Sequence, residues 1–90
     1  MLKKLSDVIA EILVEEGVGH VFAVSGGASL HLIHSIADNS SINHICNHQE
    51  QASAMAADSY SRVSGNIGVA MATSGPGATN LITGICCSYY

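Results

Sequence analysis

The sequence predicts an α/β fold, a parallel sheet flanked by helices, and three observations support this prediction. Helical and strand-like segments alternate along the 90 residues in the order α-β-α-β-α-β-α. The strand-like segments are short, apolar and partly β-branched. A polar or glycine-containing turn follows each of them before the next helix begins. Strands that alternate with helices usually pair in parallel through right-handed crossovers, which indicates a single parallel sheet.

The first half of the chain is predicted to form helix, strand and helix. An amphipathic helix is expected from Leu5 to Glu16, and Gly17 supplies its left-handed cap. His20 to Val24 is expected to be a buried strand, and Ser29 to Ala37 a second helix before the polar loop at Asp38 to Ser41. The apolar residues that recur at helical spacing in the first helix are Leu5, Val8, Ile9, Ile12 and Leu13.

The second half repeats the alternation. Ile42 to Asn47 is expected to be a strand, and Gln49 to Val63 an alanine-rich helix whose small residues allow close packing. Gly65 closes that helix. Ile67 to Thr73 is expected to be a third, buried strand, and a fourth helix is expected from Ala78 onward.

The composition predicts a surface that other protein covers. The chain is 48% hydrophobic and 11% charged, whereas about 25% charged residues are usual in soluble domains. The last residues, "TGICCSYY", form an apolar run without a helix stop signal, so we expect the N-terminal piece of a longer protein. The net charge is -4, and Lys3, Lys4 and Arg62 are the fixed cations, which argues against a nucleic-acid partner.

The sequence favours a cytoplasmic protein without a membrane span. The odd number of cysteines and the adjacent pair indicate reduced thiols, and we expect Cys46, Cys86 and Cys87 to be small buried side chains. Ile67 to Tyr90 carries no charge, but Ser74-Gly-Pro-Gly77 divides it into halves that are each too short to cross a bilayer.

Candidate ligand-binding residues follow each predicted strand. These are Ser25-Gly26-Gly27, Gln49-Glu50-Gln51 and the stretch Thr73 to Asn80. In an open parallel sheet, ligands bind at the carboxyl ends of the strands, so the three features are expected to meet. Gly75 and Gly77 are the residue type that an unusual backbone angle or the close approach of a ligand requires, although a plain tight connection would also use them.

Two further interpretations of these residues are open. "GPGATN" resembles a dinucleotide-binding glycine turn, but Asn80 stands where the third glycine belongs. Glu50 is either an ordinary acidic residue in the first turn of a helix or a carboxylate that a ligand contacts. The histidines have no metal-ligand spacing, so no metal site is predicted.

Three segments together resemble the pyrimidine-binding domain of thiamine-diphosphate-dependent enzymes. They are "VFAVSGGASLHLI", "NHQEQASAMAADSYSRVSG" and "GVAMATSGPGATNLITGI", and the resemblance extends over nearly the whole chain. The likeness is greatest to the large-subunit group of acetolactate synthase (acetohydroxyacid synthase). The resemblance implies that residues 1–90 are an N-terminal pyrimidine-binding domain, incomplete at its C-terminus, and that the middle and diphosphate-binding domains are absent.

The resemblance also implies a role for each matching residue. Glu50 takes the place of the glutamate that contacts N1′ of the aminopyrimidine and shares a proton with it, which makes it the catalytic residue. Magnesium and its ligands would belong to the absent diphosphate domain, a flavin is left open, and a second subunit of a homodimer or tetramer would complete the site. The implied cofactor-binding residues are Ser25, Gly26, Gly27, Glu50, Thr73, Pro76, Gly77 and Asn80.

The implied function is the decarboxylation of pyruvate or another small 2-keto acid and transfer of the two-carbon unit. Ser25 and Gln49 stand where many relatives have Pro and His, which leaves other thiamine-diphosphate decarboxylases and oxidases as alternatives. A different alternative is a non-catalytic remnant or interaction module that docks onto a full-length homologue. In either case the 90-residue piece is expected to be inactive alone.

Overall fold

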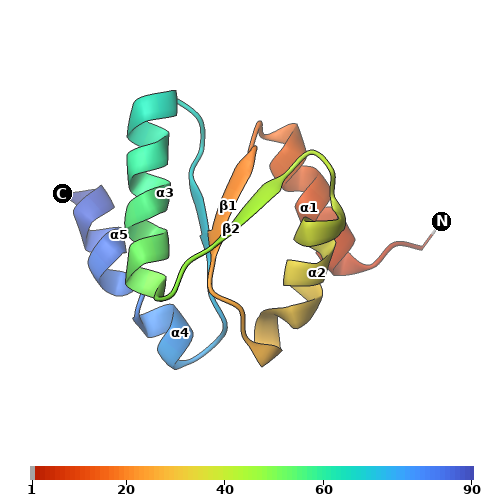
Figure 1. The fold of residues 1–90 in the computed structure, drawn as a ribbon. Coiled ribbons are helices and arrows are strands. Elements are labelled where there is room, and N and C mark those ends of the chain that lie inside the picture. Colours follow the sequence, from red (N-terminus) through yellow and green to blue (C-terminus); the bar gives the residue numbers. More distant parts are fainter. Residues whose placement is uncertain (1) are drawn as a thin grey trace.

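The computed structural model describes residues 2–90 and contains a parallel sheet with helices on both faces (Figure 1). The predicted fold class is therefore confirmed. The elements in chain order are α1 (Leu5–Glu15), β1 (His20–Ala23), a 3₁₀ turn η1 (Gly27–Ser29), α2 (Leu30–Asp38), β2 (Asn43–Cys46), α3 (Glu50–Ser64), β3 (Val69–Met71), α4 (Pro76–Thr79) and α5 (Ile82–Tyr89).

The sheet has the strand order β2-β1-β3, and all pairings are parallel. The first strand along the chain is therefore the central one. His20 pairs with Asn43 of β2, and Val21 pairs with Val69 of β3. Because both neighbours run parallel to β1, the carboxyl ends of the three strands lie at one edge of the sheet.

Two layers of helix cover the sheet. α1 and α2 lie together on one face, and α3 and α5 lie on the other (Figure 1). Side chains alternate along β1, so that Val21 and Ala23 join the core beneath α1 and α2, while Phe22 lies against Tyr60 of α3 with ring centroids 5.9 Å apart. The core cluster consists of Ala10, Val18, Val21, Ala23, Ile36, Ile42 and Met71.

The glycine caps follow the sequence prediction. Gly17 ends α1 with a φ of 84°, and Gly65 ends α3 with a φ of 78°, both in the left-handed region that favours glycine. Val18, directly after the first cap, is buried in the core.

The third strand and the last helix differ from the prediction. β3 is only three residues long, Met71 is its one buried residue, and Ile67, before the strand, is 50% exposed; within residues 2–90, β3 pairs with β1 on one side only. The helix expected from Ala78 begins earlier, at Pro76, and is interrupted at Asn80 and Leu81 before α5 begins.

The predicted apolar face of α1 is also corrected. Leu5, Ile9 and Ile12 are exposed, and the residues that pack into the core are Ala10, Leu13 and Val14. Apolar residues cover a broad arc of this helix, and α2 packs against only part of it.

All three cysteines are exposed rather than buried. Cys46 lies in β2, an edge strand whose residues are all exposed. Cys86 and Cys87 lie on α5, which packs against α3 on one side only and leaves these thiols facing outward.

Candidate functional site

The ends of β1 and β3 are in close contact at the carboxyl edge of the sheet. A Cβ built on Gly26, after β1, would lie 2.7 Å from Cγ2 of Thr73, after β3. A real Cβ does not approach another carbon so closely, so only glycine permits this packing at residue 26. The two loops are therefore joined into one wall of the candidate site.

The end of β2 brings Glu50 to the same edge. Glu50 is the first residue of α3 and is half-buried. Ser53, fully buried one turn later, donates a hydrogen bond from Oγ to Oδ1 of Asn47, at 2.9 Å. This hydrogen bond ties α3 back to the end of β2 and so sets where the helix begins.

Glu50 meets the loop after β3 across the site. Asn80 donates a hydrogen bond from Nδ2 to Oε1 of Glu50, at 3.3 Å. A Cβ built on Gly77 would lie 3.5 Å from Oε2 of Glu50 and 2.9 Å from Cγ2 of Thr73. The structure thus brings Gly26, Glu50, Thr73, Gly77 and Asn80 together.

The turn between Thr73 and Gly77 uses one glycine for a backbone angle, as the sequence suggested, and another for close packing against the chain itself; the close approach of a ligand stays a prediction. Gly75 has a φ of 74°, a backbone angle that favours glycine, and Gly77 is buried at the close approach to Thr73. Pro76 occupies the first turn of α4, where the missing N–H costs no helical hydrogen bond.

Three of the predicted cofactor-binding residues lie outside this group of contacts. Ser25 and Pro76 are exposed at the same edge. A Cβ on Gly27 would have no heavy atom within 4 Å, so nothing within residues 2–90 requires glycine there. Their proposed role depends on a ligand or on protein outside the described chain.

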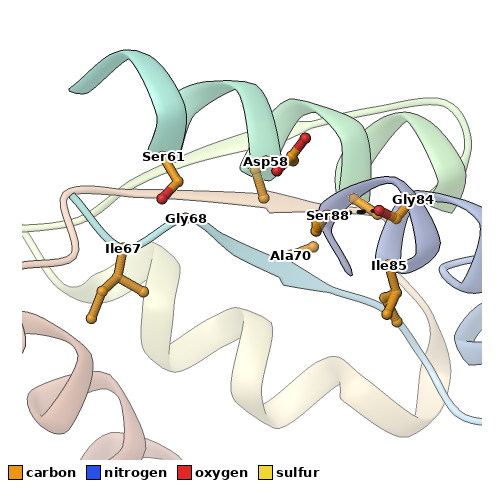
Figure 2. Close-up of a pocket in the computed structure, with 10 residues that line it drawn as sticks. Asp58, Ser61, Ile67, Gly68, Ala70, Gly84, Ile85 and Ser88 are labelled. Atoms are coloured by element: carbon orange, nitrogen blue, oxygen red, sulfur yellow. Dashed lines mark hydrogen bonds between the residues drawn. The ribbon is translucent and has the colours of Figure 1, made fainter. Parts of the chain in front are cut away.

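The site is a single open wall. Asn80 is exposed and Glu50 only half-buried, so the described residues do not enclose a ligand at this edge. A hollow of about 360 Å³ lies elsewhere, between α3, α5 and β3, and Figure 2 shows the residues that line it. It includes none of the residues grouped around Glu50.

Sequence reasoning missed the Ser53–Asn47 hydrogen bond. The only sequence signal was a serine three residues after Glu50 in an otherwise alanine-rich helix.

Within the described residues, no three side chains of His, Cys, Asp or Glu are grouped closely enough to hold a metal ion. No helix between residues 2 and 90 is long and apolar enough to cross a membrane.

Comparison with known proteins assigns the family. Residues 3–90 match the family described as thiamine pyrophosphate enzyme, N-terminal TPP binding domain; thiamine pyrophosphate (TPP) is another name for thiamine diphosphate. The chain is 44% identical over 90 residues to the acetolactate synthase large subunit of Haemophilus influenzae, covering 98% of this chain and 16% of that protein. It is 43% identical over 83 residues to the chloroplastic acetolactate synthase of Arabidopsis thaliana, covering 92% of this chain and 12% of that protein.

A third relative agrees with these two. The acetolactate synthase large subunit of Pyropia yezoensis is 48% identical over 80 residues, covering 86% of this chain and 14% of that protein. The chain therefore spans between 12% and 16% of the length of these relatives. It belongs to the thiamine pyrophosphate enzyme family, and the region that it shares with that family is the N-terminal TPP-binding domain.

Proposed function

We propose that this chain supplies the pyrimidine-binding wall of a thiamine-diphosphate site in an enzyme of the acetolactate synthase type. Such an enzyme decarboxylates pyruvate or another small 2-keto acid and transfers the two-carbon unit. The observation that carries the proposal is the contact of Glu50 with the Gly77–Asn80 turn, which joins the ends of β2 and β3. Family membership and the acetolactate synthase relatives support it.

The residues of the wall fit an aminopyrimidine ring. Asn80 engages Oε1 of Glu50, and within residues 2–90 Oε2 has no hydrogen-bond donor. That oxygen is free to accept or share a proton at a ring nitrogen. Gly77 has no side chain that would cover Oε2, because a Cβ built there would lie 3.5 Å from that oxygen.

Glu50 would hold a proton between its carboxylate and N1′ of the ring. Bound thiamine diphosphate supplies the carbon chemistry, because its thiazolium accepts the electrons released on decarboxylation. Asn80 orients the carboxylate by its hydrogen bond, and the packing of Gly26 on Thr73 keeps the adjoining loops together. The proposed cofactor-binding residues are Ser25, Gly26, Gly27, Glu50, Thr73, Pro76, Gly77 and Asn80.

The remainder of the site is proposed to come from other protein. Residues 1–90 would be part of the pyrimidine domain, and a diphosphate-binding domain of a second subunit, in a homodimer or tetramer, would hold the diphosphate and its magnesium ion. The exposure of Asn80 and Pro76 at the open wall supports a covering partner. A cytoplasmic location belongs to the same proposal, supported by three free thiols.

The test uses a chimera in which this chain replaces the matching 90 residues of the Haemophilus influenzae relative. Glu50→Gln should slow exchange of the C2 proton of bound thiamine diphosphate, followed by NMR in deuterium oxide, by about 10²-fold or more, the usual scale for loss of acid–base catalysis. An amide cannot share a proton with N1′ as a carboxyl group does.

Glu15→Gln is the matched control, since Glu15 is exposed at the far end of α1. The control should exchange at the rate of the unaltered chimera. If the Glu50 variant also kept that rate, the assignment of Glu50 as activator would be wrong.

A non-catalytic interaction module is the second candidate. Large apolar side chains are exposed on several elements, including Leu30 at 59%, Tyr89 at 82% and Tyr90 at 95%. A module of this kind would bind a full-length homologue and leave the chimera inactive. If the enzyme is instead another thiamine-diphosphate decarboxylase or oxidase, its own holoenzyme would be active without the chimera. Its product from pyruvate would then not be acetolactate.

A further inference from the structure

The helix that carries Glu50 begins without a side-chain cap. Gln49, directly before α3, has an extended backbone, and its side chain makes no capping hydrogen bond. The first N–H groups of a helix have no partners inside the helix, and helix ends fray. Glu50 is the first residue of α3, so its position depends on what holds this helix start in place.

Asn80 orients the carboxylate of Glu50 but does not by itself fix where Glu50 lies. Their hydrogen bond is 3.3 Å long, beyond the usual range of about 2.7–3.2 Å for an N–H donor and an oxygen acceptor. Asn80 is also exposed. The placement of Glu50 therefore depends mainly on the backbone of the first turn of α3.

Two hydrogen bonds connect that first turn to the central strand. The backbone N–H of Asn47 donates to the carbonyl of Ala23, the last residue of β1, at 2.9 Å. Oδ1 of Asn47 accepts a hydrogen bond from Oγ of Ser53, also at 2.9 Å. Ser53 lies one turn after Glu50, so a short path of two bonds runs from β1 through Asn47 to the start of α3.

Ser53 differs in kind from its neighbours on the buried face of α3. Its exposure is 0%, and it shares this face with Ala54 and Ala57. Alanine forms helices better than serine does, and a buried hydroxyl without a partner destabilises a fold. The hydrogen bond to Asn47 offsets both effects, and it is the contact that a serine makes here and an alanine could not.

We propose that Ser53 and Asn47 are positioning residues that hold Glu50 where it can share a proton with an aminopyrimidine ring. Neither contacts the reacting atoms in this proposal, and both act through the first turn of α3. Proton sharing requires a heavy-atom distance of about 2.6–3.2 Å, so a helix start that frays would impair it before the fold is lost. The inference rests on the proposed function and adds the residues that fix the position of the activating carboxylate.

Ser53→Ala is tested in the chimera on the Haemophilus influenzae relative, loaded with thiamine diphosphate. Exchange of the C2 proton should slow by about tenfold or more, because a misplacement of about 1 Å can lower a rate by 10²-fold. The affinity for thiamine diphosphate, measured by calorimetric titration, should not change, because the proposed cofactor contacts remain. A loss of affinity without a loss of exchange rate would contradict the positioning role.

Ser35→Ala is the matched control. Ser35 is also a buried helical serine, with 3% exposure, and its Oγ donates a hydrogen bond to Oδ1 of Asp7. It lies on α2, on the opposite face of the sheet from α3 (Figure 1). This variant should lower the free energy of unfolding in urea, as Ser53→Ala does, and keep the exchange rate of the unaltered chimera. Equal slowing in both variants would identify general destabilisation as the cause.

Asn47→Ala removes the acceptor of the same hydrogen bond. Asn47 is only half-buried, so this variant carries the test even where Ser53→Ala does not fold. It should slow C2 exchange as Ser53→Ala does, and the double variant should be no slower than either single one, because the two side chains form one bond. Additive losses would show that the two residues act separately.

The helix start also gives a readout that needs no cofactor. In the 90-residue chain, the N–H of Ser53 bonds to the carbonyl of Gln49, and the N–H of Gly65 bonds to that of Ser61 at the other end of α3. Asn47→Ala should speed amide hydrogen exchange at Ser53 by about tenfold, followed by NMR, and leave Gly65 unchanged. An unchanged rate at Ser53 would mean that the bond does not hold the helix start.

Glu50→Gln, measured in the same chimera, separates this inference from the proposed function. Slow exchange in Glu50→Gln together with the unaltered rate in Ser53→Ala and Asn47→Ala would overturn the positioning role alone. The unaltered rate in Glu50→Gln would overturn the role of Glu50 as activator and the positioning role with it.

Discussion

Gly77 is the residue on which the geometry of the candidate site most depends. It is buried, and the place of its missing side chain lies between Thr73 and the carboxylate of Glu50. Any side chain there would separate the turn after β3 from α3. The absence of one atom thus maintains the contact between two loops that are far apart in sequence.

Gly77→Ala is expected to destabilise the chain. The new Cβ would lie 2.9 Å from Cγ2 of Thr73, and overpacking of this kind costs about 1–3 kcal/mol, offset by up to about 1 kcal/mol of helix propensity in α4. Urea denaturation measures the loss in the free energy of unfolding.

Thr73→Ser tests the cause. Serine lacks the clashing methyl group, so the double variant should recover part of the stability. Gly27→Ala is the control, because its Cβ would meet no heavy atom within 4 Å. A loss at Gly27 as large as that at Gly77 would mean that crowding is not the cause.

At the scale of elements, the packing of α5 on α3 rests on a contact between small residues. A Cβ on Gly84 would overlap the side chain of Ala54 and lie 3.2 Å from its carbonyl carbon. Gly84 is buried, and every other residue of α5 is exposed. Gly84 therefore lets α5 lie close to α3 at Ala54.

Gly84→Ala should therefore push α5 away from α3 and lower the free energy of unfolding by about 1–3 kcal/mol. Adding Ala54→Gly removes the opposing Cβ and should restore part of the loss, as a double-mutant cycle by thermal or urea unfolding would report. Thr83→Ala, exposed on the same helix, should change stability by no more than about 0.5 kcal/mol. Additive effects of the Gly84 and Ala54 changes would contradict the contact.

The sequence predicted element type and order well, and individual faces less well. The glycines at residues 17 and 65 marked helix ends correctly, because few other residues adopt a positive φ. Which arc of α1 faces the core was not predictable, since Leu5 and Ile12 are as apolar as Leu13 and only tertiary packing distinguishes them. The break at Asn80 was missed for a similar reason: no proline or glycine marks it, and Asn80 leaves the helix where it bonds to Glu50.

Part of the site was also predictable at this scale. In a parallel sheet the carboxyl ends of the strands meet at one edge. The sequence alone therefore predicted that Gly26, Glu50 and Thr73 lie close together. The bond from Asn80 to Glu50 and the tether from Ser53 to Asn47 depend on side-chain directions. The roles of Ser25, Gly27 and Pro76 stay predictions, because their contacts would lie outside the chain.

At the scale of the whole molecule, the open wall and the exposed apolar side chains describe a surface that is incomplete by itself. Leu5, Ile12 and Leu30 are exposed on the α1–α2 layer, and Ile82 and Ile85 on the other layer. The exposed apolar surface that accompanies the low charge content of the sequence therefore lies on both faces of the molecule. A protein with this surface is expected to need a covering partner before its proposed site can work.

The purified chain alone should therefore form no acetolactate from pyruvate in the presence of thiamine diphosphate and magnesium. A colorimetric acetolactate assay tests this, with the chimera on the Haemophilus influenzae relative as the positive control. Turnover by the 90-residue chain above the level without protein would show that the open wall is sufficient.

The position of the first strand at the centre of the sheet sets an order of assembly. β1 can pair with β2 soon after both are synthesised, but its pairing with β3 spans about twice as many residues, and each doubling of a closed loop adds about 0.6 kcal/mol of entropic cost. A nascent chain would hold one side of β1 unpaired until β3 leaves the ribosome. During that interval the apolar strand HVFA is the segment most exposed to wrong partners, and a chaperone would have its best opportunity there.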